Sequence, residues 1–256
     1  MKMVKRGFCC PADIEKVRKV KEAGYDYAEV AVVFLMGLSD EEFEVFAKEF
    51  KEIWGSAYSH AGLFPGSVPV VGPEFNKEKI TAYLEKALGR VQTLGGKFVV
   101  FGSGGSRKIP EGFSREEGME QIEWAAREAG RVAETKGITI VMEELRKEEC
   151  NTLNSITETY AFVKKVNHPA VKLLADYYHM VQAGEGMDEL VKFADEIRHM
   201  HFAEPVNRTA PKVTDNFDYK AFFALLDKIG YTGGVSVEAR VQDFDLDVKE
   251  GIKVYI

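Results

Sequence analysis

The sequence alternates short apolar runs with amphipathic helical stretches eight times, and this alternation constrains the fold more than any other feature. The expected strands cover residues 4–10, 25–33, 56–64, 97–105, 138–143, 171–176, 197–201 and 234–238. Several of these runs are short and almost entirely apolar, which is typical of strands that are buried on both faces. Regular alternation with helices favours parallel pairing of the strands.

The stretches between the strands carry the end signals of helices. Pro11 suits the start of the first helix, and Gly24 suits the position just after its end. Capping boxes are expected at Ser39/Glu42, Ser114/Glu117 and Ser155/Glu158. An open doubly wound sheet is the alternative fold, but it normally has a Gly-rich turn after its first strand, where this chain reads FCCPAD. We therefore predict an α/β fold, a single (β/α)8 TIM barrel, formed by residues 1–256 as one catalytic domain.

Composition and charge narrow the range of partners. The chain carries 34 Lys and Arg against 41 Asp and Glu, a net charge of −7, so most of its surface should repel a phosphate backbone. We expect no nucleic-acid partner. The first residues lack the apolar core of a signal peptide, and no apolar run is long enough to cross a membrane, so a cytoplasmic protein with no membrane partner is expected. Aromatic and Met-containing helices are compatible with a homo-oligomer.

Four of the expected strands end on a side chain that can bind a metal ion. These residues are Glu143, Asp176, His201 and Glu238. They are roughly 25 to 40 residues apart, the length of one or more strand–helix units, so each would lie at the carboxyl end of its own strand. In a barrel of parallel strands these ends meet at one rim, where active sites are built. We expect the four side chains to share one divalent cation.

Two glutamates, one aspartate and one imidazole make a hard set of ligands with mostly oxygen donors. Such a set suits Mn²⁺, Mg²⁺ or Co²⁺ better than a metal that prefers thiolates. Mn²⁺ is the ion we expect first, and Mg²⁺, Co²⁺ and Zn²⁺ are the alternatives. Three carboxylates crowded together without an ion would take up protons, so the cation should stabilise the pocket as well as serve the chemistry.

The segments around these residues resemble those of a known family. MEELRKEECNTLNS, ADYYHM, HMHFAEPVNRTAP and SVEAR are similar to the successive metal-site segments of the sugar (and sugar-phosphate) isomerase/epimerase superfamily. These are the xylose-isomerase-like TIM barrels that include tagatose and psicose 3-epimerases, and the resemblance covers residues 25–240. It implies a metal-dependent isomerase, closest to ketose 3-epimerases, that removes and returns a proton through a metal-stabilised enediolate.

The resemblance also implies roles for individual residues. Glu143 and Glu238 correspond to the metal-bound acid and base of the family, and Asp176 and His201 to the other metal ligands. Return of the proton on the opposite face would invert C3 of a ketose, whereas its return to the neighbouring carbon would give aldose–ketose isomerisation. The sequence leaves both outcomes open.

Three further residues match positions that contact the substrate in this family. They are Glu149, His179 and Arg208, which would hold oxygens at C1 to C3 of a small-molecule sugar or sugar derivative. The chain departs from the family where Glu-Pro-Leu-Asn is common and where it has Glu143-Glu144-Leu145-Arg146 instead. This change leaves open a substrate carboxylate or phosphate held by Arg107, Lys108 or Arg146.

Other functions remain compatible with the same barrel. A lyase or dehydratase would use the same proton abstraction and then expel a β-leaving group from a keto-sugar or related polyhydroxy carbonyl compound. An apurinic endonuclease of this superfamily needs three zinc ions and more histidines than the five present here. A non-catalytic sugar-binding barrel would be expected to lack Glu143 or Glu238, and both are present.

Overall fold

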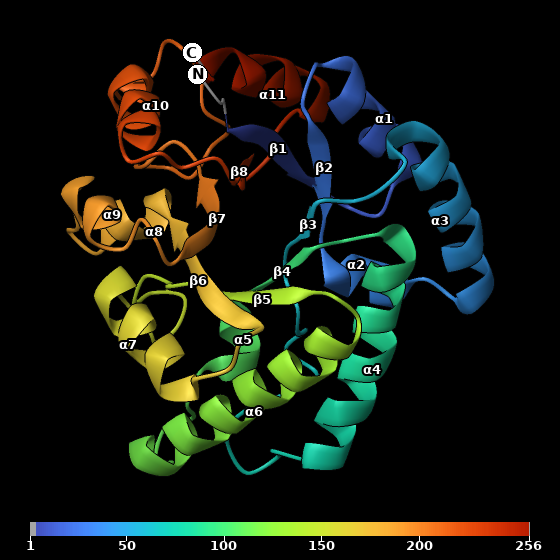
Figure 1. Cartoon of the computed structure of the whole chain (residues 1–256), viewed down its shortest axis with the longest axis vertical. Coiled ribbons are helices and arrows are strands. Elements are labelled where there is room, and N and C mark those ends of the chain that lie inside the picture. The colour runs from blue at the N-terminus through green and yellow to red at the C-terminus, as the bar shows by residue number, and fades with distance from the viewer. Residues whose placement is uncertain (1–3, 256) are drawn as a thin grey trace.

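The computed structural model describes residues 4–255, and its centre is a sheet of eight parallel strands (Figure 1). The strands are β1 (Lys5–Cys10), β2 (Tyr27–Val30), β3 (Ser59–His60), β4 (Phe98–Phe101), β5 (Thr139–Met142), β6 (Val171–Asp176), β7 (Ile197–Phe202) and β8 (Gly234–Val237). They pair in the order β2-β1-β8-β7-β6-β5-β4-β3. Beyond β2 and β3, the amides of Val32 and Val33 donate to the carbonyls of Ala61 and Gly62. The predicted TIM barrel is therefore confirmed, and it is nearly closed.

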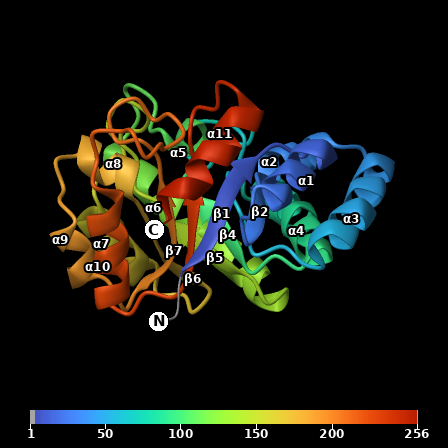
Figure 2. The same cartoon turned by 90° about the horizontal axis from the view of Figure 1, so that it is seen from above.

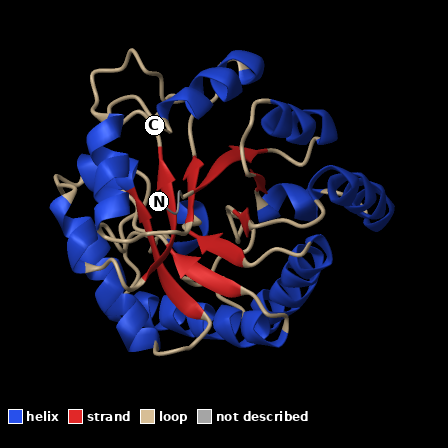
Figure 3. Cartoon of the chain, turned by 45° about the horizontal axis from the view of Figure 1, so that its top comes forward, coloured by secondary structure: helices blue, strands red, loops and turns tan. Residues whose placement is uncertain are grey.

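Helices surround the strands (Figure 3). The longer ones are α1 (Ile14–Glu22), α3 (Asp40–Trp54), α4 (Lys77–Leu94), α6 (Arg115–Thr135), α7 (Ile156–Val166), α10 (Tyr219–Lys228) and α11 (Phe244–Gly251). The short ones are α2 (Val32–Gly37), α5 (Gly104–Arg107), α8 (Tyr177–Gln182) and α9 (Asp188–Lys192). Because α2, α5 and α8 directly follow β2, β4 and β6, they lie at the carboxyl ends of the strands (Figure 2). Among residues 4–255, no helix combines the length and the apolar character needed to cross a bilayer.

Each strand sends alternate side chains outward to the helices and inward to the centre of the barrel. On β7, Met200 and Phe202 belong to the apolar core that the strands share with the helices. His199 and His201 point the other way and have no exposed surface. Glu29 on β2 is likewise buried on the inner side. The strands are therefore buried on both faces, as expected, but the inner face is polar at this level.

The first helix starts later than the sequence suggested. Pro11 lies before the helix, and α1 begins at Ile14. The side chain of Asp13 accepts hydrogen bonds from the amides of Glu15 and Lys16. An aspartate at the N-cap satisfies amides that would otherwise lack a partner, and this contact sets the start of the helix more strongly than a favourable proline dihedral.

The capping boxes are only partly as predicted. Ser39 accepts from the amide of Glu42, and the Glu42 carboxylate accepts from the amide of Ser39, which completes the box. Ser114 and Ser155 also accept from the third amide of their helices, but in the described chain neither has a reciprocal bond to its glutamate. Glu158 accepts the amide of the residue before Ser155 instead. At Ser155 the glutamate therefore bonds to an amide one residue earlier than a capping box requires.

Candidate active site

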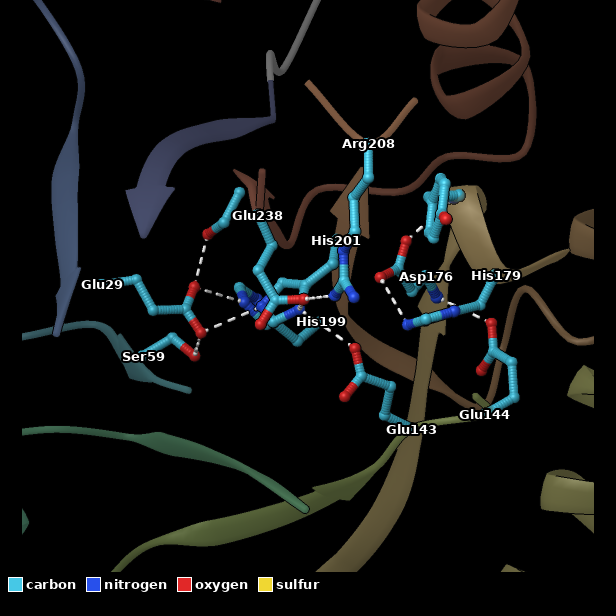
Figure 4. A network of polar contacts seen from close by, with 12 residues as sticks. Glu29, Ser59, Glu143, Glu144, Asp176, His179, His199, His201, Arg208 and Glu238 are labelled. Atoms are coloured by element: carbon cyan, nitrogen blue, oxygen red, sulfur yellow. Dashed lines mark hydrogen bonds and ion pairs between the residues drawn. The ribbon is translucent and has the colours of Figure 1, made fainter. Parts of the chain in front are cut away.

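The four predicted metal ligands meet at the carboxyl ends of their strands (Figure 4). Glu143 follows β5, Asp176 ends β6, His201 lies in β7 and Glu238 follows β8. One ligand atom from each residue lies within 4.8 Å of the other three. Nδ1 of His201 is 3.3 Å from Oε1 of Glu143 and 3.6 Å from Oε2 of Glu238. The strands thus bring together side chains that are far apart in the sequence.

One carboxylate oxygen of Asp176 is fixed by a hydrogen bond, whereas the other has no such partner among the described residues. Its Oδ1 caps α8 by accepting the amide of Tyr178 at 2.8 Å. Its own amide donates to Oε1 of Glu144 at 2.8 Å. The second oxygen, Oδ2, is buried among the cluster and has no hydrogen-bond partner within the described residues. An unpartnered buried carboxylate oxygen is costly, and a cation is the partner that the surrounding oxygens and nitrogen favour.

The loop after β4 shapes the space around Glu143. A Cβ atom added to Gly102 would lie 1.8 Å from Oε2 of Glu143, so only glycine leaves room for this carboxylate. Nη2 of Arg107, a fully buried residue in α5, donates to the carbonyl of Glu143 at 2.8 Å. The Gly-rich segment 102–106 therefore packs directly against a site residue.

Arg208 joins two of the predicted site residues. It lies in the loop after β7 with a φ of 57°, which is unusual for a residue other than glycine. Its Nη2 is 2.6 Å from Oε2 of Glu238, and its Nη1 is 2.9 Å from Oε2 of Glu149. Glu149 also accepts from Nε of Arg146 at 2.8 Å. This chain of paired charges fixes the guanidinium of Arg208 beside the cluster.

The ring of His179 presents an N–H donor to the cluster of the four predicted metal ligands. Its Nδ1 accepts the amide of Arg146 at 3.2 Å, so the proton of the neutral ring is assigned to Nε2. Nε2 lies 3.6 Å from Oδ2 of Asp176 and has no hydrogen-bond partner among the described residues. Burial, together with the positive charge of Arg208, lowers the pKa of His179 to about 3. The ring therefore stays neutral across the working range of pH.

Two of the three residues considered for an anionic group are engaged elsewhere. Arg107 has no exposed surface and donates to the protein backbone, and Arg146 is paired with Glu149. Lys108, the residue after α5, is exposed. The geometry does not favour a substrate carboxylate or phosphate held by Arg107, Lys108 and Arg146.

The carboxyl groups of the cluster have shifted pKa values in the metal-free chain. Burial, and then the charge of Glu143, raise the pKa of Asp176 to about 7. Burial and the charge of Glu238 also raise the pKa of Glu143. For Glu238 itself, burial alone would raise the pKa, but the charges of His201 and Arg208 outweigh it and lower the pKa. Carboxyl groups whose environments push their pKa values apart are typical of acid–base pairs.

The sequence interpretation missed Glu29. This residue is buried and accepts a hydrogen bond from Nε2 of His201 at 3.0 Å, on the opposite side of the ring from the cluster. The available signal was weak, because Glu29 is one of two acidic residues, with Asp26, in the expected strand 25–33. Cys9, Glu29 and His201 also have ligand atoms within 4.8 Å of one another.

Comparison with known proteins identifies the family. The sequence profile of the xylose isomerase-like TIM barrel family matches residues 17–255. This chain belongs to that family. L-ribulose 3-epimerase from Methylomonas sp. (strain DH-1), a curated relative, is 29% identical over 221 residues, which cover 85% of this chain and 74% of the relative. The resemblance to 3-epimerases that was expected from the sequence is thus confirmed, and the relatives are isomerases.

Solved structures share the same barrel. D-allulose 3-epimerase from Methylomonas sp. superposes with a TM-score of 0.84 at 22% identity, over 99% of this chain and 97% of that one. The apo form of 3-keto-D-glucoside 4-epimerase, YcjR, from E. coli gives a TM-score of 0.83 at 21% identity, over 98% of each chain. At these identities the likeness shows the fold alone.

Proposed function

We propose that this protein is a divalent-cation-dependent ketose 3-epimerase in which Glu143 and Glu238 exchange the proton at C3. The observation that carries the proposal is the meeting of Glu143, Asp176, His201 and Glu238 within 4.8 Å at the carboxyl ends of the strands. The membership of an epimerase-containing family adds weight, because the curated relative named above acts as a 3-epimerase. Neither feature depends on the other.

The residues of the cluster fit a hard divalent cation. Glu143, Asp176, His201 and Glu238 would hold it with three carboxylates and one imidazole nitrogen, a donor set that suits Mn²⁺. The free Oδ2 of Asp176 and Nδ1 of His201 both face the centre of the cluster. When bound, the cation supplies positive charge that stabilises the negative charge developing on the substrate's carbonyl and hydroxyl oxygens.

Proton transfer is assigned to the two glutamates. Glu238 is ionised beside Arg208 and is assigned to accept the C3 proton. Glu143, whose pKa is raised in the metal-free chain, is assigned to deliver a proton to the other face of C3. The reverse reaction exchanges the two roles. Inversion at C3 follows because the proton leaves and returns through different side chains.

Three residues are assigned to substrate binding. His179 offers its unpartnered Nε2–H to a sugar oxygen and stays neutral while doing so. Arg208 is held between Glu149 and Glu238, and its guanidinium donors lie next to Glu238, the proposed base. Glu149 fixes Arg208 and can accept from a hydroxyl group. Together they would position the C3–H bond between Glu143 and Glu238.

A panel of sugars tests the proposed reaction. The Mn²⁺-loaded protein is incubated with ketoses, aldoses and keto-acids, and the products are separated by chromatography. We expect ketoses to be converted to their C3 epimers and the other compounds to remain unchanged. Formation of an aldose would show that the reaction is an aldose–ketose isomerisation. Loss of water or another β-group would identify a lyase or dehydratase.

Replacing Gly102 by alanine should displace the Glu143 carboxylate, because the added Cβ would overlap Oε2. A displacement on the order of 1 Å lowers rates by about 100-fold, so kcat/KM for the ketose should fall roughly 10- to 100-fold. Gly105→Ala is the matched control, since the nearest atom to its added Cβ is 3.9 Å away. Steady-state kinetics of both variants provide the comparison, and equal rates would contradict the assigned position of Glu143.

Metal binding should become tighter as the pH rises. The pKa of Asp176 is raised from 3.8 to about 7, so in the metal-free chain this carboxyl keeps its proton until near-neutral pH and a cation must displace it. Mn²⁺ affinity should therefore increase between about pH 5 and pH 8, by up to about tenfold per pH unit for each proton released. Calorimetry in buffers with different ionisation enthalpies counts these protons. An affinity that is constant over this range would contradict the prediction.

The same shift predicts how the metal-free fold responds to pH. A carboxyl group whose pKa is raised in the folded state stabilises the fold fully below its ordinary value of 3.8, and this contribution is lost as the pH rises through about 7. Glu238 has a lowered pKa, so its stabilising contribution is complete above its ordinary value of 4.5 and does not change in this window. Thermal unfolding should show a stabilisation by Mn²⁺ that grows from pH 5 to pH 7.

A further inference from the structure

Glu29 is a carboxylate enclosed in the centre of the barrel, and all its hydrogen-bonding capacity is used. It has no exposed surface. Its Oε1 accepts from Nε2 of His201 at 3.0 Å and from Oγ of Ser59 at 3.1 Å. Its Oε2 accepts from Nε2 of His199 at 2.8 Å and from Oγ of Ser236. Burying a carboxylate is costly even with such partners, so its presence inside the barrel calls for a function.

The contact with Glu29 determines which ring nitrogen of His201 is free to bind a cation. An ionised carboxylate only accepts hydrogen bonds, so Nε2 of His201 must carry a proton. In the neutral ring, the lone pair is then on Nδ1. Nδ1 faces Glu143 Oε1 at 3.3 Å and Glu238 Oε2 at 3.6 Å, on the side of the proposed cation (Figure 4). The nitrogen that a metal ion requires is therefore the one that Glu29 leaves free.

We propose that Glu29 is a positioning residue that fixes the orientation and the protonated nitrogen of His201 for cation binding. The inference rests on the cation site proposed above and adds a residue that does not touch the ion. A carboxylate behind a ligating histidine raises the basicity of the ring and holds its plane, and loss of such a partner typically weakens metal affinity about 10- to 100-fold.

The alternative arrangement, in which Glu29 itself binds an ion with Cys9 and His201, is disfavoured by the same contacts. Both oxygens of Glu29 already accept two hydrogen bonds each, which leaves no lone pair for a metal. Burial also raises the pKa of the Cys9 thiol well above its ordinary value, so its thiolate form is disfavoured in the metal-free chain. Glu29 therefore acts on the ion through His201.

Mn²⁺ affinity of two Glu29 variants tests the inference without any assay of turnover. Glu29→Met removes the acceptor, and Glu29→Gln keeps one carbonyl oxygen that can still face His201. We expect calorimetry to show an affinity about 100-fold weaker for Glu29→Met and about 10-fold weaker for Glu29→Gln. Ser59→Ala is the matched control because it removes one neutral donor from the same oxygen of Glu29. It should bind Mn²⁺ within about threefold of the unchanged protein.

A second measurement determines directly which nitrogen of the His201 ring carries the proton. In Zn²⁺-loaded protein with ¹⁵N-labelled histidine, NMR should show a proton on Nε2 of His201 and the ion on Nδ1. Should Glu29→Met fail to fold, as judged by circular dichroism, Glu29→Gln decides the matter. Folded variants that bind Mn²⁺ as tightly as the unchanged protein, or an ion found on Nε2, would overturn the positioning role and leave the proposed function intact. No Mn²⁺ binding by the unchanged protein would instead reject the proposed function.

Discussion

Replacing either Glu143 or Glu238 by glutamine in the Mn²⁺-loaded protein is expected to lower ketose turnover about 10³-fold or more. Each substitution removes a proton acceptor or donor and also a negative charge next to the proposed cation. The amide is close in shape to the carboxylate, so the fold should be retained. Steady-state rates, measured after metal content has been confirmed by elemental analysis, give the result.

Glu144→Gln is the matched control for these substitutions. Glu144 is adjacent to Glu143 in the sequence and is buried like it, and its Oε1 accepts the amide of Asp176 at 2.8 Å. Burial and the charge of Asp176 raise its pKa well above its ordinary value, which favours the neutral carboxyl group that a glutamine resembles closely. Its loss should change turnover less than about tenfold. If the Glu143 or Glu238 variant kept a near-normal rate with the metal in place, the two-glutamate mechanism would be wrong.

Removing the cation should weaken sugar binding as well as abolish turnover. The proposed substrate chelates the ion through two adjacent oxygens, while His179 and Arg208 hold neighbouring groups, so most of the binding contacts depend on the ion. Without it, Arg208 remains paired with Glu149 and Glu238 and does little for the sugar alone. Calorimetric titration of the sugar with and without a chelator should show an affinity at least about 100-fold weaker in the metal-free protein.

A variant at His179 distinguishes contacts to the sugar from contacts to the cation. His179→Ala removes the free Nε2–H donor but none of the four proposed ligands. It should weaken sugar binding about tenfold and leave Mn²⁺ affinity within the same order of magnitude. Equal sugar affinity in the metal-free and metal-loaded protein would show that the sugar binds elsewhere and would favour a different reaction.

The parts of this structure that follow from local sequence pattern could be predicted. The alternation of apolar runs with helical stretches is repeated eight times, so errors at single boundaries leave the barrel unchanged. Glu143, Asp176, His201 and Glu238 could be grouped because parallel strands bring their carboxyl ends to one rim. α7 (Ile156–Val166) begins directly after Ser155, where the sequence indicated a helix start.

The remaining features depend on contacts between distant segments. The role of Glu29 rests on Ser59, His199, His201 and Ser236, which come from three other strands. Nothing in the run that contains Glu29 indicates which of these would face it. The need for glycine at position 102 similarly arises from the Glu143 carboxylate, which follows the neighbouring strand. Such contacts require the register of the sheet, which the sequence pattern does not provide.

Deuterium exchange tests the central claim most directly. The Mn²⁺-loaded protein is incubated with a ketose substrate in D₂O, the protein and metal are removed, and NMR identifies the carbon that has gained deuterium. We predict deuterium at C3 of the ketose in both epimers, and no exchange with the Glu143→Gln or Glu238→Gln variant. Deuterium at C1, or epimerisation without any incorporation from solvent at any time, would contradict proton exchange at C3 by Glu143 and Glu238.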